Sequence, residues 1–182
     1  TMEVYKKNLL IVGLGRIGRA VAERAKAFGM HLMAYDGFVS KEAMEQSGVE
    51  KINVLEEGIK KADFITLHVP LTEETKGMVS GEQFKLMKSS AYIINMGRGA
   101  VIDEKALIEA LQNGEIAGAG LDVLETEPPR TDHPLFSMDQ VIFTPHIGGD
   151  TREAKMRTSS LLSHSMIEVM EGQNVYNWVN RK

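Results

Sequence analysis

The sequence contains no cysteine, and this absence excludes several kinds of chemistry. A chain without cysteine has no disulfide framework, no thiol nucleophile and no zinc site built on thiolates. The histidines and carboxylates show no metal-ligand spacing either. We therefore expect no metal site.

The sequence also lacks the features of membrane proteins and nucleic-acid-binding proteins. No apolar run approaches the ~20 residues of a membrane-spanning helix, and residues 1–8 are polar and charged, unlike a signal peptide. The net charge is −4, which argues against nucleic acid as the main partner. With 182 residues, of which 43% are hydrophobic, we expect a cytoplasmic domain with a sizeable core.

What the sequence does contain is a regular alternation of short apolar runs with helical patterns. This alternation is typical of α/β proteins in which helices cover both faces of a parallel sheet. The expected strands are residues 8–12, 31–36, 51–52, 62–68, 91–94, 117–121 and 141–144. Side chains that can cap a first turn mark the helix starts. They are Asn53 with Glu56, Ser80 with Gln83, Asp103, and Asp150 with Glu153. The predicted fold is a doubly wound, Rossmann-type parallel sheet.

Three glycines follow the first apolar run in the pattern G-x-G-x-x-G. In a strand–turn–helix unit that holds a dinucleotide, Gly13 permits the tight turn, Gly15 lets a pyrophosphate approach the backbone, and Gly18 lets the helix pack closely on the strand. The N-terminus of the helix then faces the phosphates. The pattern alone is weak evidence, but an apolar helical face follows it. That face is expected to comprise Ile17, Ala20, Val21, Ala25 and Phe28.

Asp36 ends the second expected strand, 18 residues after Gly18. An acid about 20 residues beyond the glycines is the residue that binds the ribose hydroxyls of NAD in this kind of fold. A carboxylate in this place repels the 2′-phosphate of NADP. The sequence therefore favours NAD as the cofactor.

Polar side chains follow the later strands at the points where the strands end. They are His68, Arg98, Asp122, Glu127 and His146. Because ligands of doubly wound sheets bind at the carboxyl ends of the strands, we expect these side chains to gather at one edge. The other histidines, His31, His133 and His164, lie in no motif and are expected to be surface or core residues.

Several motifs contain these residues. They are Gly13-Leu14-Gly15-Arg16-Ile17-Gly18, His68-Val69-Pro70-Leu71-Thr72, Ile94-Asn95-Met96-Gly97-Arg98-Gly99, Leu121-Asp122-Val123 with Glu127-Pro128, and Pro145-His146-Ile147-Gly148. In this order they resemble the NAD-binding domain of the D-isomer-specific 2-hydroxyacid dehydrogenases of the phosphoglycerate dehydrogenase type. The resemblance covers nearly the whole chain. It implies hydride transfer between NAD and a small D-2-hydroxy acid or 2-keto acid, with 3-phosphoglycerate as one candidate.

The resemblance also implies which residues act. Arg98 binds the substrate carboxylate, a task that suits a planar guanidinium with paired donors. His146 is the acid/base, since a histidine with an ordinary pKa of ~6.5 exchanges protons near neutral pH, and Glu127 orients its ring. Asp122 accepts from the nicotinamide carboxamide. The other implied cofactor contacts are Arg16, Ile17, Val69, Pro70, Met96, Gly97, Arg98, His146, Gly148 and Gly149.

By the same resemblance, residues 1–150 form the NAD-binding domain. Residues 151–182 form a hinge helix and a segment that returns to a second, substrate domain, on which Val175, Tyr176, Trp178 and Val179 are expected to dock. Most of that domain is expected to be missing from this chain, so NAD binding should survive while turnover is weak or lost. Family members commonly dimerise through the NAD-binding domain, which implies a homodimer.

Other functions are compatible with the same sequence. Corepressors that sense NAD(H) share this fold and these motifs, and an NAD-binding fragment without turnover is a further alternative. Formate dehydrogenase is disfavoured because it carries glutamine where Glu127 stands. An NADPH-linked hydroxypyruvate or glyoxylate reductase is disfavoured by Asp36.

Overall fold

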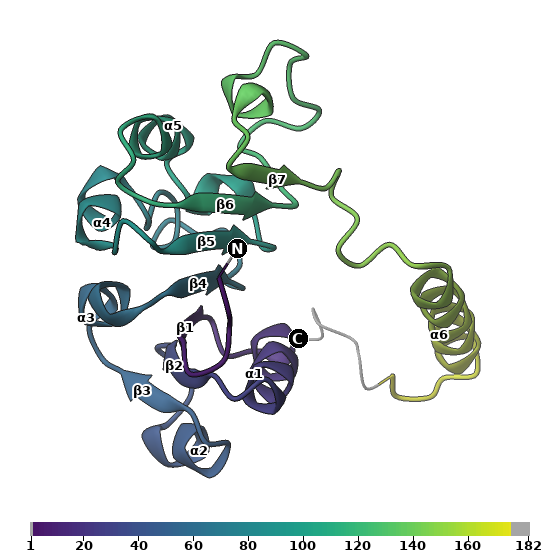
Figure 1. The fold of residues 1–182 in the computed structure, drawn as a ribbon. Helices are drawn as coiled ribbons and strands as arrows, with labels where there is room; N and C mark the ends of the chain where they lie inside the picture. Colours follow the sequence, from purple (N-terminus) through teal and green to yellow (C-terminus); the bar gives the residue numbers. More distant parts are fainter. Residues whose placement is uncertain (1, 176–182) are drawn as a thin grey trace. The chain divides into compact units, whose positions relative to one another are not determined.

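The computed structural model describes residues 2–175, and Figure 1 shows their ribbon. The chain divides into two compact units, Thr1–Pro145 and His146–Lys182, and each is described by itself. Tyr176, Trp178 and Val179, which were expected to dock on a second domain, lie outside the described residues.

The first unit is built on a seven-stranded sheet in the order β3-β2-β1-β4-β5-β6-β7. The strands are β1 (Asn8–Val12), β2 (His31–Tyr35), β3 (Glu50–Ile52), β4 (Phe64–Leu67), β5 (Tyr92–Asn95), β6 (Gly118–Leu121) and β7 (Val141–Phe143). Every neighbouring pair is parallel. The strand order reverses between β1 and β4, which is the switch point where doubly wound folds bind their ligands. The predicted fold class is confirmed.

Helices cover both faces of this sheet, as Figure 1 shows. They are α1 (Arg16–Ala27), α2 (Lys41–Gln46), α3 (Leu55–Lys61), α4 (Gly81–Leu86) and α5 (Glu104–Gln112). The alternation of side chains along β1 explains the two layers. Leu10 and Val12 belong to the core under α3, α4 and α5, whereas Leu9 and Ile11 belong to the core under α1 and α2.

Local capping signals place two of the helix starts correctly. Ser80 and Gln83 form a reciprocal capping box at α4, and the Asp103 carboxylate accepts the Ala106 N–H at α5 (3.0 Å). The expectation for Asn53 is wrong, because α3 begins at Leu55 with Val54 as its N-cap. Val54 keeps an extended backbone (φ −123°, ψ 120°), and Leu55, the first residue of the helix, is buried.

The expected apolar face of α1 is confirmed for Ala25, which is buried, and for Val21, which packs against the core, but not for Ile17 and Phe28. Its buried residues are Gly18, Ala22 and Ala25, while the side chains of Ile17 and Phe28 are 61% and 64% exposed. Small side chains line the inner face because α1 passes very close to β1. Residue size therefore decides which side of this helix faces the sheet.

The second unit contains α6 (Arg152–Met170). Its N-cap is Thr151, whose hydroxyl accepts the Ala154 N–H (3.0 Å), so the expected Asp150 cap is wrong. Asp150 instead forms an ion pair with Lys155 (2.7 Å). None of the helices in residues 2–175 is both long and apolar enough to cross a membrane.

Candidate cofactor-binding and active site

The turn after β1 requires glycine at its first position. Gly13 has a φ of +92°, and a Cβ there would lie 2.9 Å from Val69 Cγ1 and 3.0 Å from the His68 carbonyl oxygen. The turn after β1 and the end of β4 therefore lie in direct contact. This contact places the glycine turn at the switch point of the sheet.

Gly15 and Gly18 have opposite surroundings. A Cβ on Gly18 would overlap the carbonyl oxygen of Gly13, so only glycine lets α1 pack this closely on the turn. A Cβ on Gly15 would meet nothing within 4 Å. No side chain caps the first turn of α1 and no acidic residue lies in it. The helix N-terminus therefore presents exposed N–H groups to an open space, as an anion site requires.

Asp36 is tied to the glycine turn by its own carboxylate. Its Oδ2 accepts the Leu14 N–H (2.8 Å), while Oδ1 accepts the N–H groups of Phe38 (2.8 Å) and Val39 (3.0 Å). Asp36 thus joins β1 to the loop after β2. Sequence reasoning did not foresee this second role.

His68 lies at the end of β4 beside the glycine turn. Its Nε2 lies 2.9 Å from Thr66 Oγ1, and its buried Nδ1 has no hydrogen-bond partner among the residues that the structure describes. Burial removes water from the ring and lowers the pKa of His68 below its ordinary value. The imidazole is therefore held in its neutral form at physiological pH.

The lowered pKa of His68 predicts a pH dependence of stability. Below about pH 6.5 the unfolded chain binds a proton at this histidine more readily than the folded chain does, so stability falls as the pH falls. His68→Gln keeps a polar atom near Thr66 but does not titrate. We expect the variant to lose less unfolding free energy than the unchanged chain between neutral pH and pH 5. Urea unfolding at each pH measures the difference, with His164→Gln on the exposed surface of α6 as control. Parallel curves for His68→Gln and the unchanged chain would contradict this prediction.

The turn after β5 carries Arg98. Asn95, which is 1% exposed, holds this turn by accepting the Gly97 N–H and donating to the Arg98 carbonyl, both at 3.0 Å. Arg98 itself is exposed, and its guanidinium donates to the Gly97 carbonyl (2.8 Å). A Cβ on Gly99 would overlap the Leu124 carbonyl. The Arg98 turn therefore packs directly against the loop that follows β6.

The loop after β6 carries Asp122 and Glu127. Asp122 is 5% exposed and accepts a hydrogen bond from Thr144 Oγ1 (2.5 Å), which links the ends of β6 and β7. Glu127 is exposed, and its Oε1 accepts the Leu124 N–H (3.1 Å). Glu127 and Arg98 thus stand on two segments that touch each other through Gly99.

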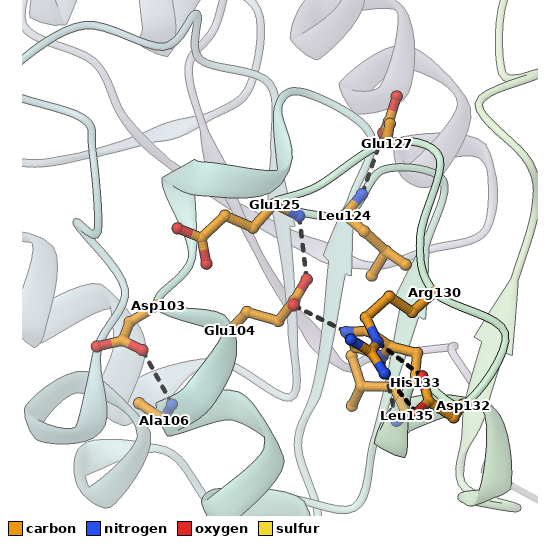
Figure 2. A network of polar contacts seen from close by, with 10 residues as sticks. All are labelled: Asp103, Glu104, Ala106, Leu124, Glu125, Glu127, Arg130, Asp132, His133 and Leu135. Carbon is orange, nitrogen blue, oxygen red and sulfur yellow. Dashed lines mark hydrogen bonds and ion pairs between the residues drawn. The ribbon is translucent and has the colours of Figure 1, made fainter.

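The residues around this loop form the polar network that Figure 2 shows. Glu104, the first residue of α5, accepts from the Glu125 N–H (3.0 Å) and pairs with His133 Nε2 (2.9 Å). His133, expected to be a surface or core residue, is half-buried and contacts Glu104, a pairing that the sequence did not indicate.

His146 belongs to the second unit. Its φ is +53°, a left-handed conformation that is uncommon outside glycine. The next residues include Gly148 and Gly149, and a Cβ on Gly149 would meet nothing within 4 Å. The structure thus brings Gly13, Asp36, Arg98 and Glu127 into one unit and places His146 in the other.

A sequence profile decides the family. The profile described as D-isomer specific 2-hydroxyacid dehydrogenase, NAD binding domain, matches residues 1–148. The chain belongs to this family. The expected family resemblance is confirmed.

Curated relatives at high identity are dehydrogenases and reductases. The D-3-phosphoglycerate dehydrogenase of Methanocaldococcus jannaschii is 49% identical over 179 residues, which are 98% of this chain and 34% of the relative. The glyoxylate reductase of Korarchaeum cryptofilum is 43% identical over 180 residues, 99% of this chain and 54% of the relative. The chain therefore spans between a third and about half of the length of these relatives.

A solved structure supports the same assignment. The D-isomer specific 2-hydroxyacid dehydrogenase from Lactobacillus delbrueckii ssp. bulgaricus, in its NAD complexed form, superposes with a TM-score of 0.90 at 34% identity. The alignment covers 99% of this chain and 58% of that one. The chain therefore has the fold of the NAD-binding domain of this family.

The geometry fits the cofactor of the family. The open space at Gly15, the uncapped first turn of α1 and the nearby Asp36 carboxylate match a pyrophosphate and its adjoining ribose. Asp36 Oδ2 accepts one hydrogen bond among the described residues, so it keeps a lone pair for a ribose hydroxyl.

Proposed function

We propose that this chain binds NAD(H) and forms the cofactor side of a D-2-hydroxyacid dehydrogenase active site. The observation that carries the proposal is the packing of Gly99 on the Leu124 carbonyl. It sets Arg98 beside the loop of Glu127, at the carboxyl edge of the sheet that also carries the glycine turn. The glycine turn that would bind the cofactor, the arginine that would bind the substrate carboxylate, and the glutamate that would orient the acid/base histidine then lie at one edge of the sheet.

Each end of the cofactor would be held by a different part of this edge. Gly13, Gly15, Gly18 and the first residues of α1, Arg16 and Ile17, face the pyrophosphate, and Asp36 binds the ribose. The remaining proposed contacts, toward the nicotinamide, are Val69, Pro70, Met96, Gly97, Arg98, Asp122, His146, Gly148 and Gly149. Asp122 accepts from the carboxamide in this proposal.

The proposed chemistry uses three side chains. When bound at this edge, NADH would supply the hydride that reduces the carbonyl carbon of a 2-keto acid. Arg98 binds the substrate carboxylate through paired hydrogen bonds and so fixes the substrate's orientation. His146 donates a proton to the carbonyl oxygen as negative charge develops there, and takes it back in the oxidation of the 2-hydroxy acid. Glu127 fixes the tautomer and angle of the His146 ring.

The substrate is proposed only as a class. Two relatives are named D-3-phosphoglycerate dehydrogenase and glyoxylate reductase. The substrates in these names share a carboxylate next to a hydroxyl-bearing or carbonyl carbon. That shared group is what Arg98 and His146 recognise in this proposal. 3-Phosphoglycerate and glyoxylate are therefore the first substrates to try.

The rest of the chain is proposed to serve a second domain and a partner copy. Residues 1–150 would form the NAD-binding domain, and residues 151–182 the hinge helix and the segment that returns to a substrate domain. Side chains on α6 such as Leu162, Met166 and Met170 are 58–85% exposed apolar groups. Such a surface suits a contact with another domain or with a second copy in a homodimer.

A titration with NADH and NADPH tests the cofactor proposal. We expect the unchanged chain to bind NADH more tightly than NADPH, as followed by nicotinamide fluorescence. Asp36→Ala should weaken NADH binding by about tenfold or more, because the ribose contact and the tie to Leu14 are both lost. Loss of the tie to Leu14 would loosen the glycine turn and lower the NADH and NADPH affinities equally. The ratio of the NADH and NADPH affinities therefore isolates the ribose contact.

Glu23→Ala, an exposed acid on α1, is the matched control and should leave both affinities unchanged. Equal binding of NADH and NADPH by the unchanged chain would contradict the preference for NAD. Absence of binding to either cofactor would favour a fragment that keeps the fold without the function. Tight NADH binding without turnover, even beside a substrate domain, would instead favour an NAD(H)-sensing module.

A further inference from the structure

The loop that carries Glu127 is attached to α5 at both of its limbs. Glu104 Oε2 accepts the Glu125 N–H (3.0 Å), two residues before Glu127. Glu104 Oε1 accepts from His133 Nε2 (2.9 Å), six residues after Glu127. One carboxylate on a helix therefore holds the two limbs of the loop, and Figure 2 shows it lying between them.

The donor and acceptor roles within this arrangement are determined by the backbone. His133 Nδ1 accepts the Leu135 N–H (3.4 Å), so the ring proton is on Nε2, which donates to Glu104. The neutral ring satisfies both contacts. The side chains of His133 and Glu104 are only 15% and 17% exposed, so water screens their interaction poorly.

The ion pair between Arg130 and Asp132 differs from the Glu104–His133 contact in its exposure and in what it joins. Arg130 and Asp132 form two hydrogen bonds of 2.9 Å, but their side chains are 83% and 67% exposed and both belong to the loop itself. That pair shapes the outer part of the loop without attaching it to the sheet or to a helix. The attachment to α5 depends on Glu104.

The same attachment reaches the Arg98 turn. Gly99 packs on the Leu124 carbonyl, and Gly99, Glu104 and Leu124 line one small cavity together with Asn95. Leu124 in turn donates its N–H to Glu127 Oε1 (3.1 Å). The limb of the loop next to Glu127 is therefore enclosed between the Arg98 turn and the first residue of α5.

We propose that Glu104 and His133 are positioning residues that hold the Glu127 loop against the Arg98 turn. The proposal rests on the function proposed above for Glu127. Glu104 and His133 act through the backbone of residues 124–127. Their loss leaves the glycine turn and Asp36 intact, because these lie on other strands of the sheet.

The test uses the 182-residue chain and matched substitutions. Glu104→Ala removes both attachments. His133→Asn keeps an acceptor for the Leu135 N–H but is too short to reach Glu104, whereas His133→Gln places an amide donor near the position of Nε2. Glu109→Gln also removes one negative charge from α5, as Glu104→Ala does, but at an exposed position, and is the control.

Amide hydrogen exchange and NMR supply the readouts. In Glu104→Ala we expect exchange at Glu125 to rise by about tenfold or more, since its hydrogen bond to a carboxylate is lost. Exchange at Leu124, and at both amides in His133→Asn, should rise by a smaller factor, because there the loop loses an attachment but these amides keep their own acceptors. The buried Ile93 amide of β5 should keep its protection. The ¹³Cδ resonance of Glu127 should move in both variants and return toward its original position in His133→Gln. NADH affinity should stay within about threefold, which is under 1 kcal/mol.

Two results would overturn the proposal. One is unchanged exchange at Leu124 and Glu125 in Glu104→Ala. The other is an equal rise in exchange at Ile93, which would make the contact a general stabiliser of the fold. Neither readout depends on turnover, so a failure here is distinct from a failure of Glu127 as the partner of the acid/base.

Discussion

Gly18→Val is expected to prevent the first strand, turn and helix from packing as they do here. The new Cβ would occupy the position of the Gly13 carbonyl oxygen, and a backbone atom cannot move aside as a flexible side chain can. Ile11 Cγ2 closes the same space from the strand, 3.2 Å from that Cβ. Overpacking at such a point costs about 3 kcal/mol or more, a large part of the stability of an ordinary domain. Urea unfolding followed by circular dichroism measures the loss, and NADH titration should detect no binding.

Gly15→Ala is the control that separates folding from binding. Its Cβ would enter open space, and the φ of −75° suits alanine, so the fold should be kept. The same methyl group would stand where the pyrophosphate approaches the backbone, so NADH affinity should fall by about tenfold or more. Normal stability of Gly18→Val would contradict the close packing of α1, and full NADH affinity of Gly15→Ala would contradict the position of the cofactor.

The glycine turn shows what a sequence pattern can predict. The positions of Gly13, Gly15 and Gly18 follow from local rules for a tight turn, and so do the Ser80 capping box and the Asp103 cap. Apolarity alone predicts only part of the inward face of α1, since Ala25 and Val21 face the core but Ile17 and Phe28 do not. The small Ala22 and Ala25 are buried, whereas the larger Ile17 and Phe28 lie mostly exposed.

The arrangement of the site depended on contacts that are distant in sequence. Nothing near His133 indicates that it pairs with Glu104, which lies 29 residues earlier. Asp36 reaches Leu14 across 22 residues, and its motif indicates only the ribose contact. Asn95 is the exception, since its side chain bonds backbone groups only two and three residues ahead, as asparagine commonly does in turns. Contacts of this kind become visible only when the sheet has brought its strand ends together.

Replacement of His146 tests the proposed proton transfer directly. Because this chain spans 34% of the M. jannaschii enzyme, turnover is best measured in a hybrid in which the chain replaces the 179-residue segment that it matches. In that hybrid, His146→Gln is expected to lower kcat by about 10²–10⁴-fold, the usual contribution of a general acid/base. The KM for NADH should change much less than kcat, since the glycine turn and Asp36 are untouched and only the proposed nicotinamide contact of His146 is altered. The hybrid with the unchanged chain is the reference.

Glu127→Gln should lower kcat less than His146→Gln, because in this mechanism Glu127 acts only through the histidine ring. The decisive comparison is therefore the double variant. If Glu127 orients His146, its replacement has nothing further to remove once the imidazole is gone, and the double variant should lie within about threefold of His146→Gln. If the two residues acted independently, the fold-decreases in kcat of the two single variants would multiply in the double variant. A multiplied loss would assign Glu127 a direct contact with substrate, at the carboxyl edge that it shares with Arg98, and would leave His146 without its proposed partner.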